Sequence, residues 1–182
     1  NHVIVDLEKR LIKEIGKPKS EWSDNDKDVF RQRTIDIASN NFFGFDINPD
    51  LVKATKMNMV MNNDGSGNIL QTNSLLPPHE WESEFKEKLA NALNIDKRDI
   101  KSHDNIGYFD VIVTNPPFGS KIPIKDSHIL EQYELARIWQ KEKTNKNNWI
   151  MTNRLQSSVP PEQLFIERCI QFLRYGGRIG IV

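Results

Sequence analysis

Hydrophobic and polar residues alternate along this chain in two kinds of pattern, and the two patterns together predict helices separated by short strands. Apolar residues recur at helical spacing in five stretches: residues 3–15, 27–38, 49–61, 80–93 and 162–174. Runs rich in β-branched or aromatic residues lie between them and predict strands: residues 41–47, 68–76, 109–113 and 178–182. Because strands alternate with helices, we expect an α/β fold with a doubly wound, mainly parallel sheet.

The polar segments between these elements predict loops. Residues 120–161 look irregular, with one helix expected near residues 129–141. Gly176 and Gly177 are expected to end the helix 162–174 before the last apolar run. The chain does not begin with Met and it ends inside that run, so we expect a piece of a longer protein whose sheet is incomplete at both ends.

Composition is typical of a soluble globular domain. Of the 182 residues, 37% are hydrophobic and 27% are charged, which allows one domain with a core. No apolar run approaches the roughly 18 residues of a membrane span, and no signal-peptide pattern opens the chain. The single cysteine, Cys169, lies in a helical apolar pattern and is expected to pack in the core. The histidines lack metal-ligand spacing, so no metal site is expected.

The most informative motif directly follows the apolar run 109–113. Asn115, Pro116, Pro117 and Phe118 come after this predicted strand, where open α/β sheets bind ligands. The asparagine offers an amide oxygen, and the prolines have no N–H, so the backbone presents acceptors without competing donors. Pro117 favours an extended Pro116, and Phe118 offers a flat face for stacking. The motif therefore suits the binding of a planar amine, with a rigid surface turn as the alternative.

Two further candidate sites lie near the ends of predicted strands. Asp46, in the sequence GFDINP, ends one strand ahead of a helix that starts at Pro49. A carboxylate there accepts two hydrogen bonds from ribose hydroxyls, or it caps the helix without any ligand. Asn73, in the sequence TNSL, offers an amide oxygen to a ligand, or it stabilises its own turn.

The sequence NPPF after FDVIV resembles the catalytic motif of S-adenosylmethionine-dependent amino-methyltransferases. The closest resemblance is to N6-adenine DNA methyltransferases, in particular the modification subunit of type I restriction-modification systems. It implies a Rossmann-like methyltransferase sheet, with S-adenosylmethionine as cofactor. It also implies that Asn115, Pro116, Pro117 and Phe118 act on an adenine flipped out of the DNA duplex.

The same resemblance assigns the cofactor contacts. Asp46, with Ile47, matches the position that contacts the cofactor ribose, and Asn73, with Ser74, matches the position that contacts its adenine. Asn115 is implied to lie beside the cofactor as well. The family often has Asp where this chain has Asn73, so a charge is missing there.

One family feature is absent from the sequence. Methyltransferases of this type carry a Gly-rich loop after their first strand, and no such loop precedes Asp46. We expect the loop to lie before the first residue of this chain. A piece without it is not expected to hold the cofactor tightly by itself.

The resemblance covers the chain as part of one methyltransferase domain. Its expected parts, in chain order, are a helical lead-in (1–40), the cofactor half (41–76), an insertion (77–108), and the catalytic strand, loop and following helix and strand (109–182).

The resemblance implies a cytoplasmic protein whose partners are duplex DNA and the specificity and restriction subunits of the same system, with no membrane. The formal net charge is zero, which is low for a protein that binds DNA by itself. We therefore expect other subunits to make most of the contacts with DNA. Trp139 and Trp149 are expected to be packing residues. Basic residues after the NPPF motif are candidates for phosphate contacts: Lys121, Lys125, Lys141, Lys143, Lys146 and Arg154. Acidic residues between them favour a solvated charged loop at least as strongly.

Two other functions stay open at this point. One is methylation of a glutamine amide in a protein, as in the release-factor methyltransferases, which usually have Tyr where this chain has Phe118. The other is a non-catalytic scaffold that lacks the cofactor loop.

Overall fold

The computed structural model describes residues 2–61, 67–96, 98, 100, 107–117, 122–145 and 147–182. The chain forms two compact units, the first ending at Thr72 and the second beginning at Asn73, and each is described by itself. Over these residues, no helix combines the length and the apolar character needed to cross a membrane.

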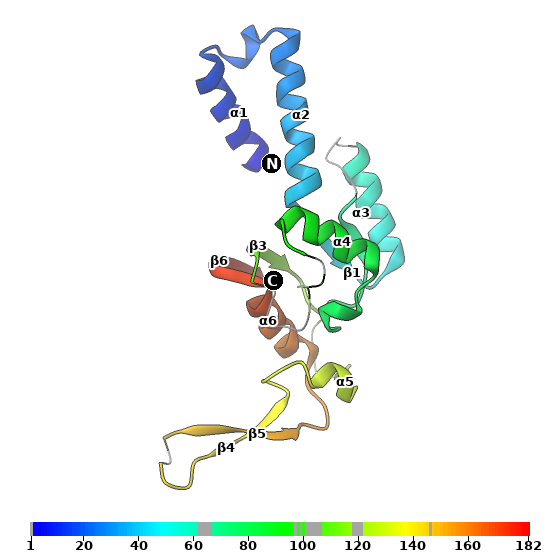
Figure 1. Ribbon diagram of the computed structural model, residues 1–182, viewed down its shortest axis with the longest axis vertical. Helices are drawn as coiled ribbons and strands as arrows, with labels where there is room; N and C mark the ends of the chain where they lie inside the picture. The colour runs from blue at the N-terminus through cyan, green and yellow to red at the C-terminus, as the bar shows by residue number, and fades with distance from the viewer. Residues whose placement is uncertain are drawn as a thin grey trace. The chain divides into compact units, whose positions relative to one another are not determined.

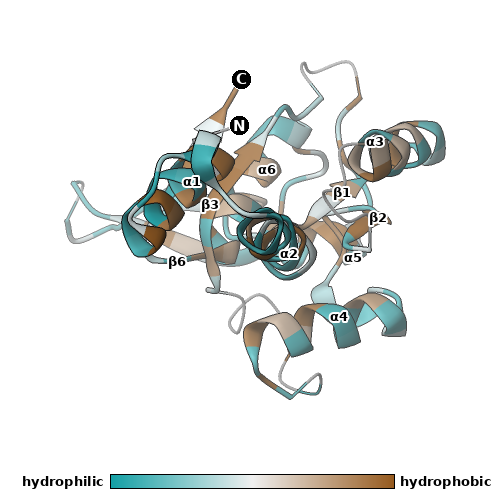
Figure 2. Cartoon of the chain, turned by 90° about the horizontal axis from the view of Figure 1, so that it is seen from above, coloured by the Kyte–Doolittle hydropathy of each residue, from teal (hydrophilic) through white to brown (hydrophobic). Residues whose placement is uncertain are grey.

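The first unit begins with two helices that lie side by side (Figure 1), α1 (His2–Ile15) and α2 (Asp24–Asn41), joined through the 3-10 helix η1 (Lys19–Glu21). Their shared core contains Leu7, Leu11 and Trp22, and most of α2 is hydrophilic (Figure 2). The predicted helices 3–15 and 27–38 are confirmed. A capping box starts α2, in which Ser23 Oγ accepts from Asp26 N at 3.2 Å.

A small βαβ motif completes the first unit. Strand β1 (Gly44–Asp46) pairs in parallel with β2 (Ile69–Gln71), and α3 (Pro49–Met61) lies between them in sequence. Both strands are shorter than the predicted 41–47 and 68–76, since α2 continues to Asn41. Gly44 permits the close pairing, because a Cβ at this position would lie 2.8 Å from Ile69 Cδ1.

The described residues of the second unit form two sheets. Strand β3 (Phe109–Thr114) pairs in parallel with β6 (Leu173–Ile181), and β4 (Arg137–Lys141) pairs antiparallel with β5 (Trp149–Leu155). Its helices are η2 (Pro78–Glu80), α4 (Ser83–Leu93), α5 (Ser127–Leu130) and α6 (Pro161–Phe172). The predicted helices 80–93 and 162–174 are thus confirmed within three residues at their starts and two at their ends.

Two groups of side chains contribute to the core of this unit among the residues that the structure describes. One is an aromatic cluster in which the Trp81 ring lies 5.2 Å from Phe85 and 5.5 Å from Phe172. The other holds the segment around α5 against α6, and its buried members are Leu75, Ile129, Leu130, Tyr133, Ala136, Val159 and Leu164. Cys169 is also buried, as predicted.

The structure corrects the predicted helix at 129–141. Helix α5 ends at Leu130, and strands β4 (Arg137–Lys141) and β5 (Trp149–Leu155) pair as a hairpin. Four apolar residues of this segment have helical spacing and are all buried: Ile129, Leu130, Tyr133 and Ala136. The backbone reaches these buried positions through consecutive turns after Leu130 and not through a continued helix. Beyond them, Ile and Trp in the sequence RIWQK favour a strand.

The structure also corrects the role of the glycine pair. Helix α6 ends at Phe172 and β6 begins at Leu173, so Gly176 and Gly177 do not end the helix. They lie where the β3–β6 register shifts, and Gly176 has φ of 81°. A Cβ on Gly177 would lie 3.1 Å from Phe109 O, so the bulge needs a glycine there.

The predicted fold class is confirmed in part: helices and strands are mixed, but the described strands form three two-stranded sheets and not one doubly wound sheet. The four predicted strands form two pairs, both parallel, as expected of a mainly parallel sheet. The antiparallel hairpin was not predicted. An apolar run bounded by a pair of prolines, such as 109–113, is typical of a buried strand, but Val111 and Val113 are exposed in the part of the chain that the structure describes. In that part, β3 pairs with β6 alone, and the face carrying these two valines is uncovered.

Candidate active site

The Asn-Pro-Pro segment lies where sequence reasoning placed it, directly after the carboxyl end of a parallel strand. Thr114, the last residue of β3, pairs with Ile181, and its carbonyl accepts from Val182 N at 3.2 Å. The ends of β3 and β6 are thus fixed beside each other. Asn115, the first residue after β3, is exposed, and the next residue, Pro116, is buried.

A buried proline next to an exposed asparagine gives the segment a fixed backbone and an accessible amide. Within the described residues the Asn115 side chain has no hydrogen-bond partner, so its amide oxygen is available to a ligand. Phe118, expected to stack on the ligand, lies outside the described residues.

Asp46 ends β1, and its carboxylate is held by the backbone that follows. Asp46 Oδ1 accepts from Asn48 N at 2.8 Å. The first turn of α3 is instead capped by Asn48, whose Oδ1 accepts from Asp50 N at 2.9 Å. The alternative in which Asp46 caps the helix is therefore wrong. Its carboxylate oxygens stay at the strand end, beside the exposed Ile47.

The second cofactor candidate follows the neighbouring strand. Thr72 N donates to the Asp46 carbonyl at 3.0 Å, so the β2 strand end is held next to the β1 strand end. The chain then continues into Asn73, whose Oδ1 accepts from Leu75 N at 3.0 Å. Asn73 therefore does stabilise its own turn. An amide oxygen has two lone pairs, so one remains for a ligand, and Ser74 lies within the same turn.

A buried pair that sequence reasoning missed holds this turn from behind. Tyr133 Oη donates to Leu75 O at 3.0 Å, and Arg168 Nη2 donates to the same carbonyl at 3.1 Å. Arg168 Nε donates to Tyr133 Oη at 2.9 Å. Both side chains are almost fully buried, and the guanidinium lies over the Tyr133 ring. The turn that carries Asn73 is thus fixed on the core of its own unit.

Burial shifts the pKa values of both Tyr133 and Arg168. Desolvation raises the pKa of Tyr133 to about 12, opposed by the neighbouring Arg168 charge. Burial also lowers the pKa of Arg168. One signal in the sequence pointed to Arg168: it occupies an apolar-face position of α6, among Leu164, Cys169 and Phe172.

The hairpin after the motif carries several of the predicted basic residues. Lys141, Lys143 and Arg154 lie on it and are not buried, whereas Lys121 and Lys146 lie outside the described residues. Trp139 and Trp149 are 40% and 55% exposed, so the prediction that they pack inside is wrong.

One comparison with known proteins decides the family. The family model for the Eco57I restriction-modification methylase matches residues 40–182, which contain all three candidate motifs. The chain belongs to the Eco57I restriction-modification methylase family. No curated protein and no solved structure matches the chain.

Membership in the Eco57I methylase family confirms the prediction of a restriction-modification methyltransferase. It also indicates DNA as the substrate of methyl transfer. Helix α1 and most of α2 precede the matched region, which opens immediately before β1.

Proposed function

We propose that this protein transfers a methyl group from S-adenosylmethionine to the N6 amine of an adenine flipped out of duplex DNA. The observation that carries the proposal is the exposed Asn115 on a fixed Asn-Pro-Pro segment at the carboxyl end of β3, in a chain of the Eco57I methylase family. The partners we propose are the specificity and restriction subunits of a type I system, in the cytoplasm.

The chemistry of the target explains why such a segment is needed. The lone pair of the adenine amine is delocalised into the ring, so this amine is a poor nucleophile. The Asn115 amide oxygen and the Pro116 carbonyl accept its two N–H bonds, orient the lone pair and stabilise the positive charge that develops on nitrogen. The product ammonium loses its proton to water, so no strong general base is required.

Phe118 is proposed to receive the flipped base by stacking. Inside a duplex the amine is out of reach, so the base must leave the helix. Stacking of a base on an aromatic ring contributes about 1–3 kcal/mol, which offsets part of the cost of unstacking.

The proposal of S-adenosylmethionine as the cofactor is supported by the hydrogen-bond acceptors that each unit offers by itself. Asp46, with one carboxylate oxygen held by Asn48 N, offers acceptors for ribose hydroxyls, and Ile47 adds an exposed apolar surface. The turn at Asn73 and Ser74 keeps one amide lone pair for the cofactor's adenine amine. When bound, the cofactor supplies an electrophilic methyl group on a sulfonium.

The test is methyl transfer from tritiated S-adenosylmethionine to DNA that lacks adenine methylation, with the full chain and its partner subunits. We expect Asn115→Ala to lower the rate by roughly 100-fold, because one positioned polar group acts in the transition state. The matched control is Asn91→Ala, on the exposed surface of α4, which is expected to retain the wild-type rate.

Two other outcomes would replace the proposal. Label in protein rather than DNA would support the glutamine-amide reaction. No cofactor binding and no label in either substrate would support a scaffold.

A further inference from the structure

The β4–β5 hairpin is a ribbon that extends from the core of its own unit (Figure 1). Its base is anchored there: Ala136 is fully buried, and Gln156 N donates to Ala136 O at 2.8 Å. Further out, Trp139 pairs with Met151 and Lys141 pairs with Trp149 across the strands. A firmly held base with an outer part open to solvent is suited to contact a partner.

Charge is concentrated on this ribbon. Residues 137–155 contain five basic residues and one acidic residue, a net charge of +4, whereas the whole chain has a net charge of zero. The basic residues are Arg137, Lys141, Lys143, Lys146 and Arg154.

The one acidic residue, Glu142, accepts hydrogen bonds from residues of the loop that joins the two strands. Glu142 Oε2 accepts from Asn148 Nδ2 at 2.9 Å, and its Oε1 accepts from Thr144 Oγ1 at 3.0 Å. These hydrogen bonds, that from Asn148 first, lower the pKa of Glu142, so it stays ionised while it closes the loop.

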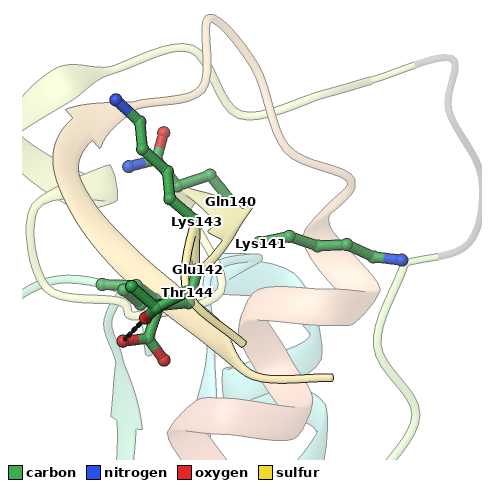
Figure 3. Close-up of a pocket in the computed structure, with 6 residues that line it drawn as sticks. Gln140, Lys141, Glu142, Lys143 and Thr144 are labelled. Atoms are coloured by element: carbon green, nitrogen blue, oxygen red, sulfur yellow. Dashed lines mark hydrogen bonds between the residues drawn. The ribbon is translucent and has the colours of Figure 1, made fainter. Parts of the chain in front are cut away.

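Three basic residues of the ribbon are left for a partner: Lys141 and Lys143 on its outer part and Arg154 near its base. Figure 3 shows that Lys141 and Lys143 extend away from Glu142. Within the part of the chain that the structure describes, neither lysine nor Arg154 forms an ion pair. The positive charge of the ribbon is therefore not cancelled locally.

The two exposed tryptophans share one face of the ribbon with Lys141. The register places Trp139 and Lys141 on the same side of β4, and their partners Met151 and Trp149 on the same side of β5. Lys141 Nζ lies 5.6 Å from the centre of the Trp149 ring. Flat rings next to unpaired cations match a partner that presents phosphates beside flat bases and sugars.

We propose that the β4–β5 hairpin binds duplex DNA and that Lys141, Lys143 and Arg154 neutralise its backbone phosphates. A two-stranded ribbon fits the major groove of B-DNA, which is about 12 Å wide. The inference rests on the proposed function, since it assigns the contact surface for that substrate. Charge complementarity decides in favour of DNA over an apolar protein partner.

The test is the salt dependence of DNA binding, measured by fluorescence anisotropy of a labelled duplex without cofactor. The variant Lys141→Gln/Lys143→Gln/Arg154→Gln removes three charges from the hairpin. The matched control, Lys9→Gln/Lys13→Gln/Arg10→Gln, removes two lysines and one arginine from the exposed surface of α1. Urea unfolding of both variants verifies that each is folded.

At about 0.9 per phosphate contact, we expect the slope of log affinity against log salt to fall by up to about 2.7 in the hairpin variant. The α1 variant should keep the wild-type slope, and Lys141→Arg/Lys143→Arg should keep it as well. An unchanged slope in the hairpin variant, an equal fall in the α1 variant, or tighter binding of single strands than of duplex would overturn the proposal.

The two proposals can fail separately. If methyl transfer to DNA is absent while the slope changes as expected, the hairpin binds DNA and the proposed reaction is wrong. If methyl transfer is intact in the hairpin variant and its slope is unchanged, the reaction stands and the hairpin assignment is wrong.

Discussion

Replacing Tyr133 with Phe isolates the contribution of the buried pair that holds the Asn73 turn. The hydroxyl is fully buried, donates to Leu75 O at 3.0 Å and accepts from Arg168 Nε at 2.9 Å. Its removal leaves Leu75 O with the Arg168 Nη2 bond at 3.1 Å, but deprives a buried guanidinium N–H of its acceptor. Hydrogen bonds that involve a charged group contribute about 1.5–3 kcal/mol, so we expect the free energy of unfolding to fall by about 2 kcal/mol.

Urea unfolding at neutral pH measures this loss. The control is Tyr175→Phe, because Tyr175 is fully exposed and its hydroxyl is not expected to affect stability. If Tyr133→Phe destabilises the protein no more than Tyr175→Phe does, the hydroxyl does not hold the Leu75 carbonyl and the argument fails.

The pH dependence of the same variant gives a second readout. Burial raises the pKa of Tyr133 from 10.0 to about 12, so the folded state keeps this proton after the unfolded state has lost it. The stabilisation is complete below pH 10 and is lost as pH rises from about 10 to about 12. Because one pKa unit corresponds to about 1.4 kcal/mol, wild type should lose about 2–3 kcal/mol more than Tyr133→Phe over this range. Parallel curves for the two proteins would contradict the assignment.

Three further predictions test the local structure. Ser23→Ala should lower the free energy of unfolding by about 1 kcal/mol by urea titration, because it removes the cap of α2; no loss would show that the capping box is not formed. Gly177→Ala should lower the free energy of unfolding by about 1–3 kcal/mol, because the new Cβ would lie 3.0 and 3.1 Å from two carbonyl oxygens. The control is Gly67→Ala, which has open space around it, and equal effects of the two variants would refute the close approach. Cys169 should react with a thiol reagent only after unfolding, because it is buried and burial raises the pKa of its thiol; fast labelling of the folded protein would contradict this.

Much of the fold follows from patterns that are local in the sequence. Helices α1, α3 and α6 were predicted because their apolar residues repeat at helical spacing over three or more turns. The site segments were predicted because strand ends followed by Asp, Asn or Pro-Pro are readable in the chain itself. Asn115 and Asp46 lie at such strand ends in the structure.

The rest depended on contacts between distant residues. The segment after Leu130 keeps helical spacing of apolar residues but leads into a hairpin, since Ala136 O accepts from Gln156 N, which lies beyond the second strand of that hairpin. Arg168 lies within an otherwise apolar face of α6, and only its contact with Leu75, 93 residues away in sequence, explains why a charge is there. Such pairings leave weak periodic signals in a single sequence.

The most direct test of the central claim is the chemical identity of the methylated product. DNA lacking adenine methylation is incubated with the full chain, its partner subunits and S-adenosylmethionine, then digested to nucleosides and analysed by mass spectrometry. The account predicts N6-methyladenine with wild type and with Asn91→Ala, and roughly 100-fold less with Asn115→Ala. Methylation at a cytosine, or N6-methyladenine formed equally by Asn115→Ala, would contradict it.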